Sequence, residues 1–241
     1  MDDPVALCVD AVAAWHAAWL TALGLRSERT DQVWRALDKP PLMYFTGIPL
    51  TRDVEADAVA DVPGSVCDAW QTFDLTPWRR RVTVREPWFY RPPAPLPEEP
   101  VPAGLEIIRV SAPAEVEEFE AVSVRGFGGE GDAVPAGTYH PAPILSDPGM
   151  AMFIGRVDEE PVAAAMGYPT DLAVGVFGVT TVTPARRRGY GTALTRAAML
   201  TETGLPTVLA PSKEAERMYL RLGFRRVGEL SIWGVTGDPG P

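Results

Sequence analysis

The chain has 241 residues, 46% of them hydrophobic, which is enough for one sizeable core or two modest ones without disulfides or metals. Its formal net charge of −10 disfavours nucleic acid and anionic membranes as partners and weakly favours a cationic or amine-bearing small substrate. The two cysteines show no CxxC spacing and the two histidines lie far apart, so we expect reduced thiols, no disulfide framework and no metal site.

The first ninety residues are predicted to form a small α+β domain. Apolar residues recur at helical spacing over 4–25, and Gly24 follows as a stop signal. A second, shorter helix is expected over 30–37, and 42–48 reads as a strand. No uninterrupted apolar stretch approaches the roughly 20 residues that span a bilayer, and the acidic N-terminus does not resemble a signal peptide. We therefore expect a cytoplasmic protein, and the alanine- and arginine-rich composition suggests a GC-rich bacterial genome.

Tryptophans and prolines mark the organisation of the chain. Six of the seven tryptophans lie before residue 90, where they are expected to fill the core of the domain 1–90; alternatively, one or two line a substrate pocket at a domain junction. Residues 91–104 contain six prolines, which predicts an extended, semi-rigid connector. We place a linker at 91–103.

After the connector, strands and helices alternate. The segment 104–110 reads as a strand, and Ser111 is the expected N-cap of an acidic helix over 113–127. A loop rich in glycine and proline covers 128–149. The remaining order is mixed α/β, with a partly parallel sheet covered by helices. It comprises strands 151–157 and 161–168 joined by an acidic turn, strand 173–182, helix 189–203, strand 206–210, a helix within 212–224 and strand 225–235.

The segment 186–192 carries three arginines, then two glycines two residues apart, between a strand and a helix. The first turn of a helix leaves N–H groups without internal partners, glycine lets the backbone approach a ligand closely, and arginine forms forked bonds to phosphate oxygens. The segment lacks the Gly-Lys-Ser/Thr end of a P-loop and the third glycine of a dinucleotide fingerprint, and the formal GxGxxG match at 126–131 follows a helix. A solvated basic helix cap is the alternative; a phosphate site is favoured.

Two motifs carry a family resemblance. "RRRGYG" at 186–191 resembles the (Gln/Arg)-x-x-Gly-x-(Gly/Ala) signature of the GNAT superfamily of acyl-CoA-dependent N-acyltransferases. "SKEAERMYLRLGF" at 212–224 resembles the (Asn/Ser)-x-x-Ala-x-x-x-Tyr-x-x-x-Gly-Phe segment of the same family. Both together predict a GNAT domain over 104–236, with a mixed central sheet of splayed strands flanked by helices. Residues 1–90 could be a degenerate copy of that fold.

The resemblance implies acetyl-CoA as the acyl donor. A backbone N–H near Val182 would polarise the acyl carbonyl, and the pantetheine arm would pair there like an added strand. Ser212 stands where the family often has an asparagine near that arm. Tyr219 matches the family position for a general acid, although it also falls on an apolar helix face and could be a core residue. The pyrophosphate is expected on the backbone N–H groups of Arg187, Arg188, Gly189, Tyr190, Gly191 and Thr192.

The sequence does not identify a general base, because Glu130, Asp132, His140 and Asp171 all read as loop residues and a chain of waters could serve instead. The favoured function is direct transfer of an acetyl group from acetyl-CoA to a primary amine of a small molecule. The alternatives are a protein N-terminus or lysine as acceptor, and a non-catalytic acyl-CoA-binding module. The acceptor and the oligomeric state stay open, a homodimer included.

Overall fold

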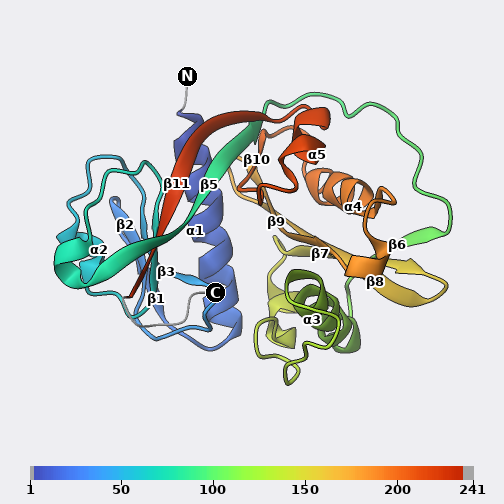
Figure 1. The fold of residues 1–241 in the computed structure, drawn as a ribbon, viewed down its shortest axis with the longest axis horizontal. Coiled ribbons are helices and arrows are strands. Elements are labelled where there is room, and N and C mark those ends of the chain that lie inside the picture. Colours follow the sequence, from blue (N-terminus) through green and yellow to red (C-terminus); the bar gives the residue numbers. More distant parts are fainter. Residues whose placement is uncertain (1–2, 236–241) are drawn as a thin grey trace. The chain divides into compact units, whose positions relative to one another are not determined.

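The computed structural model describes residues 3–235 and divides the chain into two units. Figure 1 shows their helices and strands. The first unit contains residues 1–91 and 208–241, and the second contains residues 92–207. Residues 1 and 2 of the predicted domain 1–90 and residue 236 of the predicted domain 104–236 lie outside the described residues.

The sequence predicts one contiguous domain over 104–236, and the structure differs from this prediction in where residues 208 onward belong. The break near residue 91 falls where the prolines begin, but residues from 208 onward group with the first unit. The reason is strand pairing: β11 (Arg225–Val235) runs antiparallel to β5 (Arg80–Arg91) along its whole length and also pairs with β4 (Ser65–Asp68). Such long-range pairing leaves no mark in a local sequence pattern.

In the first unit the strand order is β1-β2-β3-β4-β11-β5. The β3–β4 pair is parallel and the other pairs in this series are antiparallel, so the sheet is mixed. Helix α1 contacts β1, β3, β5 and β11. The remaining elements of the unit are α1 (Pro4–Ala22), β1 (Ser27–Arg29), β2 (Val33–Ala36), β3 (Phe45–Pro49), α2 (Asp57–Ala60), the 3-10 helix η1 (Thr76–Trp78) and α5 (Glu216–Arg221).

The helix expected over 30–37 is wrong, because this stretch contains β2. Thr30 closes a tight turn, with its hydroxyl accepting the N–H groups of Gln32 and Val33. β2 then pairs with β1 on one side and β3 on the other, and Val33 and Trp34 are both buried. Pairing with the two neighbouring strands thus determines that this segment is a strand, because the segment is too short to show helical periodicity. The strand expected over 42–48 is present as β3.

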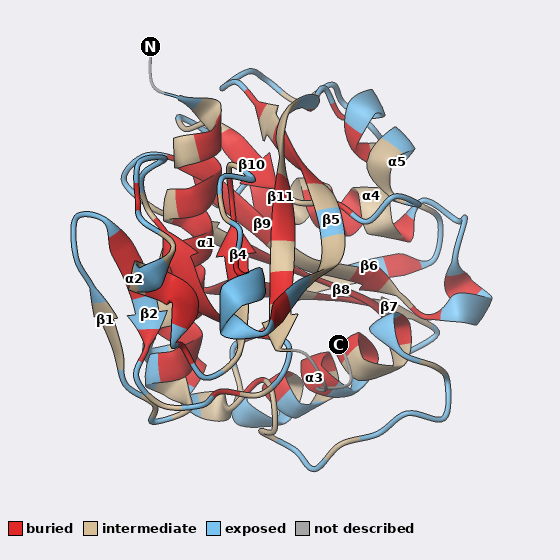
Figure 2. Ribbon diagram, turned by 60° about the vertical axis from the view of Figure 1, so that its left-hand side comes forward, coloured by how far each residue is buried: buried red, intermediate tan, exposed pale blue. Residues whose placement is uncertain are grey.

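Helix α1 begins as predicted and ends at Ala22, just before Gly24, whose φ is 72°. Asp3 caps it by accepting the N–H of Val5 at 3.0 Å. With 19 residues and a mean hydropathy of 1.5, α1 is long and apolar enough to cross a membrane, which corrects our expectation that no stretch is. One such helix is weak evidence, and 61% of its apolar window is buried inside the structure (Figure 2).

Most of the early tryptophans fill the core of the first unit, as predicted. Trp19, Trp34 and Trp88 are at most 1% exposed, and Trp15 is 5% exposed. Trp78 is 39% exposed and Trp70 is half-buried.

In the second unit the strand order is β9-β8-β7-β6, with each of these pairs antiparallel. Helices α3 and α4 cover opposite faces of these strands (Figure 1). The expected α/β architecture, an open mixed sheet flanked by helices, is confirmed. The elements are β6 (Leu105–Arg109), α3 (Pro113–Phe127), the 3-10 helix η2 (Ala142–Ser146), β7 (Ala151–Val157), β8 (Glu160–Pro169), β9 (Val174–Thr181), the 3-10 helix η3 (Thr183–Ala185) and α4 (Tyr190–Met199), while β10 (Thr207–Leu209) spans the boundary between the units.

One predicted cap is wrong. The N-cap of α3 is Ala112 rather than Ser111. The carboxylate of Glu115 accepts the N–H groups of Ser111 and Ala112 at 2.6 and 3.0 Å, so an acidic side chain in the first turn binds the residues before the helix.

Candidate functional site

The glycine–arginine segment forms the turn from β9 into α4. After η3 the chain passes through two left-handed residues, Arg187 with a φ of 64° and Gly189 with a φ of 85°. A positive φ is uncommon for a residue other than glycine, so the conformation of Arg187 marks a constrained turn. Residues 186–189 are exposed.

The start of α4 is open. Gly189 is the N-cap residue, and it has no side chain that could cap the helix. The N–H of Ala193 donates to the carbonyl of Gly189 at 3.0 Å, which leaves the N–H groups of Tyr190, Gly191 and Thr192 without a partner inside the helix. Together with the partial positive charge of a helix N-terminus, these groups can hold an anion such as a phosphate.

The three arginines have different roles. The guanidinium of Arg186 donates to the carbonyls of Thr181 at 3.0 Å and Gly126 at 2.9 Å, and so ties the end of β9 to α3. Arg187 and Arg188 are exposed at the turn and supply its positive charge. Sequence reasoning missed the structural role of Arg186, because both of its acceptors are main-chain carbonyls.

The end of β9 corrects one predicted contact. The N–H of Val182 donates to the carbonyl of Val162 at 2.9 Å, so it belongs to the ladder with β8 and is not available to a ligand. Backbone groups alternate between the two edges of a strand, so those of the preceding residue, Thr181, point to the other edge. In agreement, the carbonyl of Thr181 accepts from Arg186. Because backbone groups alternate between the two edges of an extended strand, the strand pattern in the sequence could have identified Thr181 as the residue whose N–H is available.

A β-bulge lies just before this point in β9. The register shifts between the pairs Ala164–Thr180 and Met166–Phe177, and Gly178 adopts a φ of 59°. A Cβ on Gly178 would lie 2.5 Å from the methyl carbon of Met166, so both the conformation and the packing require glycine.

The four candidate bases differ in their exposure and in their hydrogen-bond partners. His140 is 2% exposed and packs edge-on against Phe119, and burial lowers the pKa of its imidazole to about 3, so it is a neutral core residue. Glu130 is exposed, and its carboxylate accepts the N–H of Thr183 at 3.1 Å, two residues beyond Thr181. The carboxylate of Asp132 accepts the N–H of Gly129 at 2.8 Å within its own loop, and Asp171 is exposed in the turn before β9.

The carboxylate of Glu120 binds backbone groups of the loop 128–149. It is 2% exposed and lies on the buried face of α3. Its carboxylate accepts the backbone N–H groups of Gly137 at 2.7 Å, Tyr139 at 2.6 Å and His140 at 2.8 Å. A buried acid that binds three backbone amides within residues 137–140 fixes the path of that part of the loop.

Ser212 and Tyr219 belong to the first unit. Ser212 is exposed and starts a turn, with its carbonyl accepting the N–H of Ala215 at 3.0 Å, and α5 begins only at Glu216. Tyr219 is 5% exposed and packs edge-on against Phe89 and Phe224, at ring-centroid distances of 6.5 and 5.7 Å. Their predicted roles stay predictions. Among residues 3–235, no group of three or more His, Cys, Asp or Glu side chains is placed to hold a metal ion.

Comparison with known proteins agrees with this geometry. Residues 119–224 match the model of the acetyltransferase (GNAT) family. No curated protein matches the sequence significantly.

Two solved structures share the fold along nearly the whole chain. A GCN5-related N-acetyltransferase from Kribbella flavida is 21% identical, with 94% of this chain and 96% of that chain covered and a TM-score of 0.65. An acetyltransferase described as a GNAT family member from Novosphingobium aromaticivorans is 17% identical, with 94% and 98% covered and a TM-score of 0.61. The fold of the first ninety residues is therefore shared as well. Residues 119–224 thus match the GNAT acetyltransferase family, and this match supports an acyltransferase enzyme.

Proposed function

We propose that the protein transfers an acetyl group from acetyl-CoA directly to a primary amine of a small molecule. The observation that carries this proposal is the open start of α4, where N–H groups without a partner inside the helix, a left-handed glycine and two exposed arginines lie at one turn. This arrangement suits a diphosphate, and acetyl-CoA is the co-substrate that the family uses.

The N–H groups of residues 187–192 would hold the diphosphate. The backbone suits this role because the chain turns there without a side-chain cap. Arg186 supports the turn by binding two carbonyls, and Arg188 donates to the carbonyl of Pro184 at 3.5 Å. Arg187 and Arg188 are exposed and add positive charge to the turn. Arginine is well suited to a phosphate, because its planar guanidinium matches phosphate oxygens.

The acyl carbonyl would be polarised by the N–H of Thr181, which replaces Val182 in this role. It points to the edge of β9 opposite β8, next to the bulge at Gly178. A fixed backbone donor stabilises the negative charge that develops on a carbonyl oxygen under attack.

Two proton transfers accompany the reaction, because the amine must be neutral to attack and the departing thiolate gains a proton. We assign Glu130 as the base, because its carboxylate is exposed and bound at Thr183, close in the chain to Thr181, whereas His140 is buried. Tyr219 is the proposed acid and Ser212 the proposed contact to the pantetheine arm, both from their motif positions alone.

The test measures release of the free CoA thiol from acetyl-CoA across a panel of acceptors. The panel contains small primary amines, including amino acids, polyamines and aminoglycosides, and peptides with a free N-terminus or lysine. Turnover with a small amine supports the proposal, whereas turnover with peptides alone indicates a protein acetyltransferase. Tight binding of acetyl-CoA without turnover on any acceptor would leave a binding module.

A further inference from the structure

The side chain of Thr180 lies beside the proposed acyl site at the end of β9. Thr180 directly precedes Thr181, whose N–H is the proposed donor to the acyl carbonyl, and the Cα atoms of consecutive residues are about 3.8 Å apart. It pairs with Ala164 of β8 where the bulge ends. Successive side chains of a strand point to opposite faces of the sheet, so a group on Thr180 reaches one face next to that carbonyl.

The Thr180 side chain points toward α3. A Cβ on Gly126, in the last turn of α3, would lie 2.2 Å from Oγ1 of Thr180 and 2.8 Å from its methyl carbon. Any larger residue at position 126 would therefore occupy the space in front of this hydroxyl. Glycine keeps that space open, as it does where a backbone must leave room for a close neighbour or a ligand.

The hydroxyl of Thr180 is available to a ligand. Thr180 is 6% exposed, and within residues 3–235 its hydroxyl forms no hydrogen bond. The hydroxyl of Ser123, one turn before Gly126 on the buried face of α3, has no partner either, but it is fully enclosed. Buried hydroxyls nearly always have a partner, so a reachable one without a partner suits a ligand.

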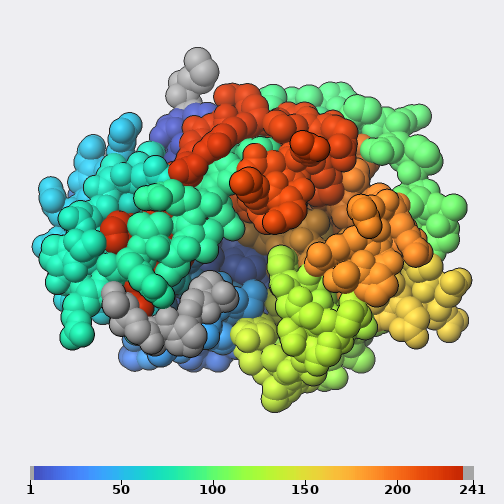
Figure 3. Space-filling model, in the orientation of Figure 1, coloured from blue at the N-terminus to red at the C-terminus, as the bar shows by residue number. Residues whose placement is uncertain are grey.

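The acceptor amine is expected on the α3 face of β9. Helices α3 and α4 cover opposite faces of the strands (Figure 1), and the proposed diphosphate turn belongs to α4. Because the cofactor is anchored on the α4 side, the α3 side remains for the attacking nitrogen. The loop 128–149, which α3 holds through Glu120 and which carries Glu130, lies at the surface (Figure 3).

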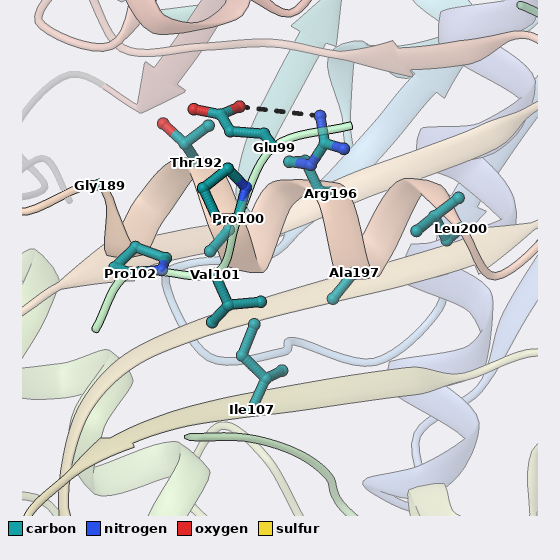
Figure 4. A pocket seen from close by; sticks show the side chains of 11 residues that line it. Glu99, Pro100, Val101, Pro102, Ile107, Gly189, Thr192, Arg196, Ala197 and Leu200 are labelled. Carbon is teal, nitrogen blue, oxygen red and sulfur yellow. Dashed lines mark ion pairs between the residues drawn. The ribbon is translucent and has the colours of Figure 1, made fainter. Parts of the chain in front are cut away.

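A cavity of about 270 Å³ in the same unit is a poorer place for the amine. It lies between α4, β6 and the proline-rich segment, with Pro100 and Pro102 in its wall (Figure 4). Its one basic group, Arg196, already donates to the carbonyl of Pro97 and faces Glu99 at 3.8 Å. In the strand order β9-β8-β7-β6 neighbouring strands are about 4.8 Å apart, so β6 lies roughly 14 Å from β9.

We propose that Thr180 determines specificity for the acceptor, with its hydroxyl accepting a hydrogen bond from one N–H of the attacking amine while Glu130 takes the other proton. This arrangement selects primary amines, because a neutral secondary amine has a single N–H, which the base requires. In the step the nitrogen bonds to the acyl carbon, the C–S bond breaks, one amine proton passes to Glu130, and the thiolate gains a proton from Tyr219. Thr180 exchanges no proton. The inference rests on the proposed function, which it narrows.

The experiment compares the most active small primary amine of the panel with its N-methyl derivative, by release of the CoA thiol from acetyl-CoA. Thr180→Val keeps the shape of the side chain and removes the hydroxyl. It should lower kcat/KM for the primary amine about tenfold, equivalent to about 1.4 kcal/mol, and leave kcat/KM for the N-methyl derivative unchanged. Thr180→Ser retains the hydroxyl and should retain the preference. Unchanged affinity for acetyl-CoA by calorimetry checks that both variants fold.

Ser123→Ala is the matched control, because it removes a buried hydroxyl without a partner from the same helix. It should change neither kcat/KM value. An equal loss for both amines in Thr180→Val, or no loss for the primary amine, would refute the inference while the proposed function stands. If the N-methyl derivative is not turned over by any of the proteins, Thr180→Ser decides, since failure to restore the rate lost in Thr180→Val would refute the role of the hydroxyl. A parent protein that acetylates no amine would contradict the proposed function itself.

Discussion

Replacing Glu120 by glutamine would probe how firmly α3 holds the loop 128–149. One oxygen of the native carboxylate accepts two N–H groups, from Tyr139 and His140, and the other accepts the N–H of Gly137. A glutamine side chain has the same shape but only one accepting oxygen. Its amide nitrogen would have to face a backbone N–H, and the most favourable arrangement places it toward Gly137.

The expected loss follows from these contacts. One buried donor left unsatisfied costs about 1–3 kcal/mol, and two charge-assisted bonds become weaker neutral ones. We therefore expect Glu120→Gln to lower the free energy of unfolding by about 2–4 kcal/mol. It should also lower turnover, because the loop next to Glu130 loses its anchor.

Urea unfolding at neutral pH measures the change, with Glu117→Gln as the control. Glu117 is exposed on the same helix, so its substitution should alter the free energy of unfolding by less than about 0.5 kcal/mol. If Glu120→Gln proves no more destabilising than Glu117→Gln, the three bonds do not hold the loop and our reasoning is wrong.

Three further predictions concern the site and the pH response. Gly191→Asp should abolish CoA binding, because it adds a negative charge to the first turn of α4; unchanged affinity by calorimetry would contradict the diphosphate site. Tyr219→Phe should lower turnover by about 10²-fold or more with little change in acetyl-CoA affinity, and equal rates would remove Tyr219 from the mechanism. Burial lowers the pKa of His16 to about 4 and that of His140 to about 3, from 6.5, so the folded state binds fewer protons. The contribution of these two histidines to stability is therefore present above pH 6.5 and lost as the pH falls toward 4 and 3, by about 2 kcal/mol per histidine between pH 7 and 5. Burial raises the pKa of Glu86 to about 7, which offsets about half of that loss over the same interval, so a net loss of about 2 kcal/mol is expected. Urea unfolding curves that coincide at pH 7 and pH 5 would contradict this.

Local signals in the sequence were sufficient for several elements. Helix α3 spans 113–127 as predicted, and the acidic turn between β7 and β8 places Asp158 and Glu159 at positive φ. Strand β5, by contrast, was not predicted, although it runs for 12 residues. Its pairing with β11 joins residues more than 130 positions apart, and no window of neighbouring residues carries that information.

The candidate site likewise has features that the local sequence determines and features that only tertiary contacts determine. The sequence by itself determined that a strand turns through glycine into an uncapped helix, because the freedom of Gly189 and the unpaired N–H groups of a first turn are local properties. Only the tertiary structure decided that the N–H of Val182 is occupied, that Arg186 is a structural tie, that His140 is buried and that prolines line a cavity beside Arg196. The physical reason is that φ and helix ends depend on adjacent residues, whereas hydrogen-bond partners and burial depend on segments that only folding brings together.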